Sequence, residues 1–71
     1  MQAHQYNRKL LVSVYNAQEA REAVLGGARI IDSEDPKSAL GNISPRRIMD
    51  ISDAVLDFHR DLEVQLSTNI G

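Results

Sequence analysis

The segment from Gly26 to Asp32 constrains the fold of this chain more than any other. Gly26 and Gly27 stand where a helix is expected to stop, because glycine adopts the left-handed conformation of a helix C-terminus without strain. The run that follows, residues 28–32, is short and apolar until its last residue, as in a buried strand. A helix followed at once by a buried strand predicts an α/β fold. In such folds ligands bind at the carboxyl ends of parallel strands, so we expect a site at Asp32 and the residues after it.

The rest of the chain continues this alternation of strands and helices. The run Lys9–Val14 is nearly all apolar and rich in branched residues, which predicts a strand covered on both faces. Asn16 and Glu19 have the spacing of a capping box at the start of the helix that precedes the glycines. Ser44 and Pro45 suit the cap and first position of a second helix. The apolar stripe of that helix is Ile48, Ile51, Val55 and Phe58.

Residues 62–66 predict a third strand, whereas the polar residues 1–8 predict a flexible lead-in. The expected order is β-α-β-α-β, with right-handed crossovers and a three-stranded parallel sheet in one small α/β unit over residues 9–71. Such a unit cannot close a barrel by itself, and it leaves sheet edges and an apolar face open. We therefore expect a homo-oligomer or association with the remainder of a longer chain.

Composition narrows the possible partners. The 71 residues carry a formal net charge of −2 and no cysteine. Binding of nucleic acid needs a basic surface, so this charge argues against it. No apolar run approaches the ~20 residues of a membrane span, and no signal pattern is present, which favours a soluble cytoplasmic protein. The two histidines have no accompanying ligand pattern, so we expect no metal site, and no cofactor motif is present.

Acidic residues are densest just after the second predicted strand. Asp32 can orient a substrate hydroxyl or act as a general base, and Glu34 shares its face if the strand continues. The alternative is a solvated loop in which Asp35 precedes Pro36 in a turn. Lys37 can supply an amine for a Schiff base or bind phosphate, although a salt bridge to Asp35 is the more common role of such a lysine.

Backbone and hydroxyl groups nearby complete the candidate site. The loop from Ser38 to Gly41 can turn its amide groups toward a phosphate, although it lacks the spacing of a P-loop. Ser67 and Thr68 follow the third predicted strand, and they either line the same pocket as Asp32 or form a polar strand exit. The candidate catalytic residues are Asp32 and Lys37. The candidate substrate-binding residues are Ser13, Glu34, Ser38, Gly41, Ser67 and Thr68.

Several segments, taken in order, carry a family resemblance. They are Leu11–Val14, Glu19–Ala23, Gly26–Ala28, Ile30–Asp32, Pro36, Leu40–Gly41 and Ser67–Gly71. This ordered set resembles the N-terminal part of (5-formylfuran-3-yl)methyl phosphate synthase, an enzyme of methanofuran biosynthesis. The resemblance implies the first part of a TIM barrel. It also implies a lyase that condenses two glyceraldehyde 3-phosphate molecules by class I aldolase-like, Schiff-base chemistry, so a phosphorylated small molecule is the implied substrate.

The chain departs from the family at one chemically important position. The family's second strand resembles Asp-x-Lys-x-Pro, in which the lysine takes part in catalysis. Here the run Asp32–Pro36 keeps the aspartate and the proline but has Glu34 at the lysine position, and a glutamate cannot form an imine. The family's other catalytic residues fall on later strands, beyond Gly71. We expect a truncated or divergent homologue that is inactive alone; the rival hypothesis is a non-catalytic α/β module that oligomerises or binds a partner through its open sheet.

Overall fold

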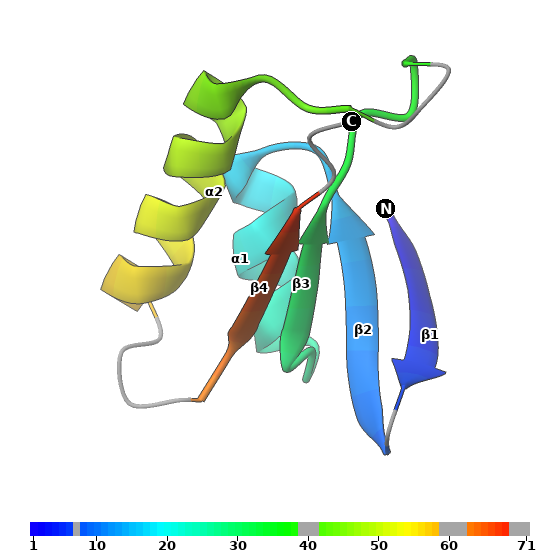
Figure 1. The fold of residues 1–71 in the computed structure, drawn as a ribbon. Coiled ribbons are helices and arrows are strands. Elements are labelled where there is room, and N and C mark those ends of the chain that lie inside the picture. Colours follow the sequence, from blue (N-terminus) through cyan, green and yellow to red (C-terminus); the bar gives the residue numbers. More distant parts are fainter. Residues whose placement is uncertain (7, 39–41, 59–62, 69–71) are drawn as a thin grey trace.

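The computed structural model describes residues 1–6, 8–38, 42–58 and 63–68, and these form a sheet with two helices on one face (Figure 1). The elements are β1 (Gln2–Tyr6), β2 (Lys9–Val14), α1 (Ala17–Leu25), β3 (Ile30–Ser33), α2 (Pro45–Phe58) and β4 (Gln65–Thr68). The sheet has the strand order β1-β2-β3-β4. The predicted α/β class is confirmed, but the sheet has four strands rather than the three expected.

The extra strand is β1, which lies in the segment that the sequence predicts as a flexible lead-in. It pairs antiparallel with β2, and Gln2 stands opposite Ser13 while Tyr6 stands opposite Lys9. Arg8, in the connection, has a φ of 65° in the left-handed region that tight turns use. Residues 1–5 are all exposed. Exposed strand residues need no apolar pattern, which explains why no strand is predicted over this segment.

The parallel part of the sheet follows the predicted topology. β2 pairs with β3 and β3 with β4, both in parallel, and one row across the three strands is Val12, Ile31 and Leu66. The first predicted strand, residues 9–14, is confirmed. The second begins two residues later than expected and ends at Ser33. The third is predicted over residues 62–66 but observed over 65–68, because its polar C-terminal half pairs at an exposed edge; residue 62 lies outside the described part.

Helix α1 has the predicted caps at both ends. The Asn16 side chain accepts a hydrogen bond from the Glu19 N–H at 2.8 Å. The Glu19 carboxylate accepts in turn from the Tyr15 N–H, one residue before the position a capping box uses. At the other end the Ala28 N–H bonds to the Ala23 carbonyl, and Gly27, with φ 107°, makes the turn that allows this Schellman bond. Gly27 is therefore the glycine that stops the helix.

The core lies between the sheet and the two helices. Val12, Val14 and Ile31 supply the sheet side of this core, and the small side chains of α1 let that helix pack closely upon it. From α2 the predicted residues Ile51 and Val55 are buried, and Ile48 is packed against the core. The side chain of Phe58 lies outside the described part of the structure. The remaining buried apolar members are Ala20, Ala23, Val24, Ala28 and Ile43.

Candidate functional site

Three of the predicted site residues form a row across the parallel strands. Ser13 of β2 stands beside Asp32 of β3, and Asp32 stands beside Ser67 of β4. Side chains alternate along a strand. Because Val12 and Ile31 point into the core under the helices, their neighbours Ser13 and Asp32 point to the other face. We call Ser13, Asp32 and Ser67 the polar row; it lies near the carboxyl ends of the parallel strands, on the face without helices (Figure 1).

A hydrogen bond joins two members of the polar row. The Ser13 hydroxyl donates to Asp32 Oδ2 at 3.3 Å, and both residues are partly buried. The hydroxyl can hold the carboxylate in one orientation while leaving its other oxygen free of this contact. The Asp32 carboxylate is thus oriented by a neighbouring hydroxyl, and its role toward a substrate hydroxyl stays a prediction.

Glu34 extends this end of the sheet by one residue beyond β3. Its N–H donates to the Val14 carbonyl at 2.9 Å, so the ladder between β2 and β3 continues past the end of the strand. The alternation therefore places Glu34 on the same face as Asp32. Glu34 also lines a hollow of about 400 Å³ at the carboxyl ends of β2 and β3. The residues around this hollow are Met1, Gln2, Ser13, Val14, Tyr15, Glu19, Glu34 and Pro36.

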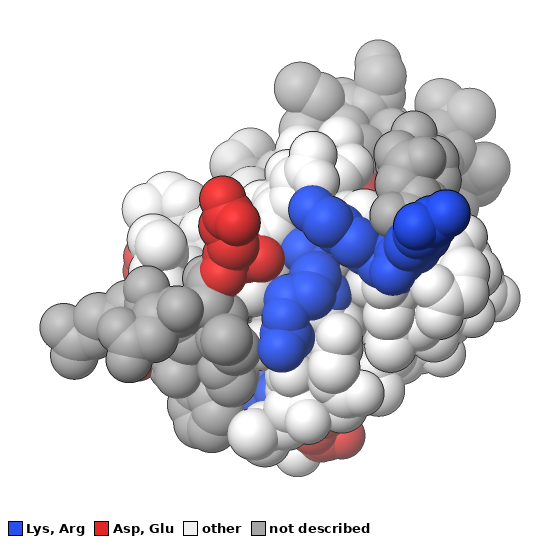
Figure 2. All heavy atoms as spheres, turned by 90° about the horizontal axis from the view of Figure 1, so that it is seen from below, with Lys and Arg blue, Asp and Glu red and all other residues white. Residues whose placement is uncertain are grey.

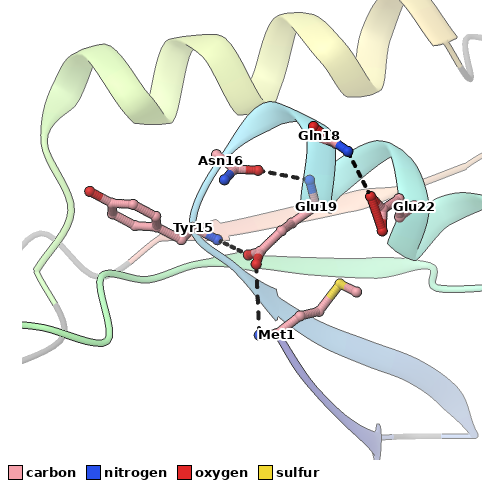
Figure 3. Close-up of polar contacts among 6 residues, drawn as sticks. All are labelled: Met1, Tyr15, Asn16, Gln18, Glu19 and Glu22. Carbon is pink, nitrogen blue, oxygen red and sulfur yellow. Dashed lines mark hydrogen bonds and ion pairs between the residues drawn. The ribbon is translucent and has the colours of Figure 1, made fainter.

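Of the eight residues around this hollow, only Ser13 and Glu34 were predicted as site residues. Met1 and Gln2 reach it because β1 returns the start of the chain to the carboxyl ends of the parallel strands (Figure 1). Tyr15 and Glu19 come from the start of α1, where Figure 3 shows the Glu19 carboxylate between the Tyr15 N–H and the Met1 ammonium group. The Met1 nitrogen lies 3.9 Å from Glu19 Oε2. The capping pattern marked Glu19 only as a helix start.

Tyr15 also connects the hollow to the second helix. The Arg47 guanidinium lies over the Tyr15 ring, 4.1 Å from its centroid. This cation–π contact joins the first turn of α2 to Tyr15, whereas the charged groups that line the hollow itself are the Met1 ammonium and the carboxylates of Glu19 and Glu34.

The loop after β3 forms a turn, which was the alternative interpretation of the acidic cluster. The Asp35 side chain accepts from the Lys37 N–H at 2.9 Å, and its carbonyl accepts from the Ser38 N–H at 3.1 Å. This is an Asx turn, which aspartate favours before proline. Lys37 is exposed, and no contact places its amine beside Asp32. Gly41, predicted to bind phosphate with Ser38, lies outside the described residues.

Thr68 does not lie on the same face of the sheet as the polar row. It stands beside Ser33 in the register of β4 and β3, in the row that contains Val14 on the helix side of the sheet. Adjacent residues of one strand point to opposite faces, so Ser67 and Thr68 cannot both line the face of Asp32 while β4 is extended.

The opposite end of the sheet differs in charge. Arg8 and Lys9 stand at the start of β2, and Arg29 directly precedes β3. Figure 2, which looks at this end from below, shows Lys and Arg side chains gathered there with Asp and Glu side chains beside them. A smaller hollow of about 290 Å³ at this end is lined by Lys9, Glu63, Val64 and Gln65. The polar row and the larger hollow therefore lie away from this gathering of cations.

The described residues contain neither a cluster of metal ligands nor a membrane-spanning helix. Within residues 1–6, 8–38, 42–58 and 63–68, no group of three His, Cys, Asp or Glu residues could hold a metal ion. In the same part of the chain, neither helix has the length and apolar character needed to cross a membrane.

Comparison with known proteins supports the resemblance found in the sequence. No curated protein and no solved structure matches the chain significantly. The family model described as 4-HFC-P synthase, whose name belongs to methanofuran biosynthesis, matches residues 10–71, from β2 through the C-terminal residue. The match spans the polar row, Glu34 and the Asx turn. The chain therefore belongs to the 4-HFC-P synthase family.

Proposed function

We propose that this chain forms the first part of a 4-HFC-P synthase-type site and binds a triose phosphate without condensing it. The observation that carries the proposal is the polar row: Ser13, Asp32 and Ser67 lie side by side on three parallel strands, near their carboxyl ends. In a TIM barrel the face opposite the helices points inward, and catalytic residues come from the carboxyl ends of the strands. The polar row occupies that position in the fold we propose.

The hydroxyl-binding part of the proposal rests on Asp32. A carboxylate held by the Ser13 hydroxyl is an acceptor for the hydroxyl groups of a triose. The phosphate group needs a cation, and we propose Arg47, which lies over the ring of Tyr15, a residue that lines the hollow.

The proposed lack of lyase activity follows from the residue at position 34, which is Glu34. An aldolase of class I needs an uncharged amine that adds to the substrate carbonyl, and Glu34 occupies the position where the family pattern has lysine. Lys37 is the nearest lysine in the sequence, but it lies in the exposed Asx turn. We therefore propose that Asp32 orients substrate, that Lys37 does not replace the missing amine, and that the chain alone is inactive as a lyase.

Borohydride trapping with glyceraldehyde 3-phosphate tests this proposal. In the Glu34→Lys variant the new amine adds to the aldehyde carbon, water leaves, and hydride reduces the resulting C=N bond to a stable secondary amine. We expect a mass adduct at position 34 in this variant and none in the wild-type chain or in the matched variant Glu34→Gln. A wild-type adduct at Lys37 would make Lys37 the catalytic amine and overturn the proposed loss of activity.

Binding is tested separately by NMR titration of the labelled wild-type chain with the same triose phosphate. We expect amide shifts at Ser13 and Asp32, and binding about tenfold weaker in Asp32→Asn, because a hydrogen bond to a charged group is lost. Inorganic phosphate as a second probe should shift Arg47 and leave the polar row unchanged. An absence of saturable shifts would overturn the binding proposal.

One observation favours a second candidate function. The four residues of β4 are all exposed, and the face of the sheet with the polar row has no helix over it in the described part of the chain. A non-catalytic module that binds a protein partner would use such surfaces. This candidate predicts association without any adduct in Glu34→Lys.

A further inference from the structure

The flank formed by β4 and α2 combines an open sheet edge with exposed apolar side chains among the described residues. β4 pairs with β3 along one edge, and its other edge has no strand partner among the described residues. Its four residues, Gln65–Thr68, include neither a charge nor a proline. Sheet edges in proteins are normally protected by such residues, so this edge is suited to pairing with another strand.

The pattern of hydrogen bonds shows which groups of β4 are available. The Gln65 N–H donates to the Arg29 carbonyl at 2.8 Å, so residue 65 directs its backbone groups toward the β3 side. Successive residues of a strand direct these groups to opposite sides. The N–H and C=O groups of Leu66 and Thr68 therefore point to the open edge.

Helix α2 carries a second apolar stripe on the same flank. Met49 and Leu56 are 65% and 62% exposed, and seven residues apart they lie within ~20° of each other around the helix. Arg47 points toward Tyr15 at the start of α1. Since Met49 lies ~200° around the helix from Arg47, the Met49–Leu56 stripe faces away from α1. Figure 1 shows that this is the side of the molecule on which β4 has its open edge.

We propose that a second copy of this chain covers this flank, related by a two-fold axis perpendicular to the sheet. Such an axis pairs β4 antiparallel with β4 of the second copy, so that one sheet continues through both. It also places the two α2 helices antiparallel, on the same side of that sheet. The interface is isologous, since the same surface is used by both copies. This proposal concerns assembly and does not depend on the chemistry proposed above.

The charges of α2 favour a second copy in this antiparallel orientation. Arg46 lies at the start of the helix and Asp57 near its end; eleven residues apart, they lie within ~20° of each other around the helix and border the apolar stripe. Antiparallel packing sets Arg46 of each copy near Asp57 of the other, and Met49 near Leu56. Parallel packing would bring like charges together. Asp53 also borders the stripe, between Arg46 and Asp57 along α2. It lies near Asp53 of the second copy at the two-fold axis, and the repulsion between these two carboxylates weakens the dimer.

Sedimentation velocity over a concentration series tests the charge pairs. We expect a dimer for the wild-type chain, and weaker dimers for Arg46→Glu and Asp57→Arg, by about fivefold or more in Kd, since each reversal affects two symmetric pairs. The double variant Arg46→Glu/Asp57→Arg should restore the wild-type Kd, and Asp53→Asn should tighten it. The matched control Arg8→Glu, in the connection between β1 and β2, should leave it unchanged.

A second test addresses the strand edge. Leu66→Pro removes an N–H that points to the open edge and spares the hydrogen bonds to β3, whereas Leu66→Ala keeps that N–H. We expect a monomer for the proline variant and a dimer for the alanine variant, with circular dichroism checking that both are folded. A wild-type chain that stays monomeric at all concentrations overturns the proposal. So does a dimer in which the double charge variant fails to restore what either single variant loses.

Discussion

The inner part of the molecule, β2-α1-β3, differs from the outer part, α2-β4, in how completely its residues are buried. Val14 and Ile31 are 1% and 0% exposed, whereas all four residues of β4 are exposed. Helix α1 is closed at both ends by short hydrogen bonds, and the Ser44 cap of α2 is long at 3.4 Å. The inner part thus lies in the core, to which α2 adds Ile51 and Val55, while the outer part also has surface that an additional partner could bury.

The largest expected effect is a cavity in the inner core. Ile31→Ala removes a fully buried side chain of β3 and should lower the free energy of unfolding by ~2–5 kcal/mol. Leu66→Ala, its neighbour in the row on β4, should cost about 0.5 kcal/mol because Leu66 is 41% exposed. Urea unfolding followed by circular dichroism measures both. Equal losses in the two variants would show that the outer strand is as firmly packed as the inner one.

A smaller effect is expected at the turn that joins α1 to β3. Gly27 has φ 107°, where a side chain is strained, so Gly27→Ala should lower the free energy of unfolding by about 1–2 kcal/mol. Gly26 has φ −79°, and an added Cβ would meet the nearest atom, the Glu22 carbonyl, at 3.4 Å. Gly26→Ala is the matched control and should be nearly neutral in the same measurement. A neutral Gly27→Ala would mean that the Schellman turn can be replaced without strain.

The same comparison explains how much of the fold could be predicted from the sequence. The glycines, the Asn16 cap and the apolar run of β2 are local signals that agree with their tertiary environment, so these elements were predicted with nearly correct bounds. Residues 2–5 of β1 and the second half of β4 are exposed, and exposed strands have no apolar pattern to detect. Both errors in the sheet, the missing strand and the shifted strand, therefore fall at its two edges.

Part of the candidate site could likewise be predicted from the sequence, and part could not. Asp32 was found because it ends a buried apolar run, and its partner Ser13 lies in the preceding strand at the register that parallel pairing sets. The hollow was missed because Gln2 and Tyr15 belong to a hairpin and a strand end, for which no motif exists. The alternation of strand residues separates Ser67 from Thr68, a distinction that depends on where β4 begins.

The N-terminal caps of the two helices are expected to differ in how much they contribute to the free energy of unfolding. Asn16→Ala removes a 2.8 Å hydrogen bond from the first turn of α1 and should cost about 1 kcal/mol of unfolding free energy. Ser44→Ala removes a 3.4 Å contact from α2 and should cost less than half as much. Thermal unfolding of both variants under one set of conditions measures the difference. A larger loss for Ser44→Ala would reverse the ranking of the two helix starts.

The smallest expected effect is at the contact between the two parts. The Arg47–Tyr15 pair joins the first turn of α2 to the end of β2, and a partly exposed cation–π pair contributes about 0.5 kcal/mol. A double-mutant cycle with Arg47→Gln and Tyr15→Leu isolates the coupling energy from the other effects of each change. Arg47→Lys should keep part of it, since an ammonium group can also lie over the ring but without the stacking of a planar guanidinium. A coupling energy of zero would mean that α2 is held by its apolar stripe, including Ile48, Ile51 and Val55, without help from the Arg47–Tyr15 contact.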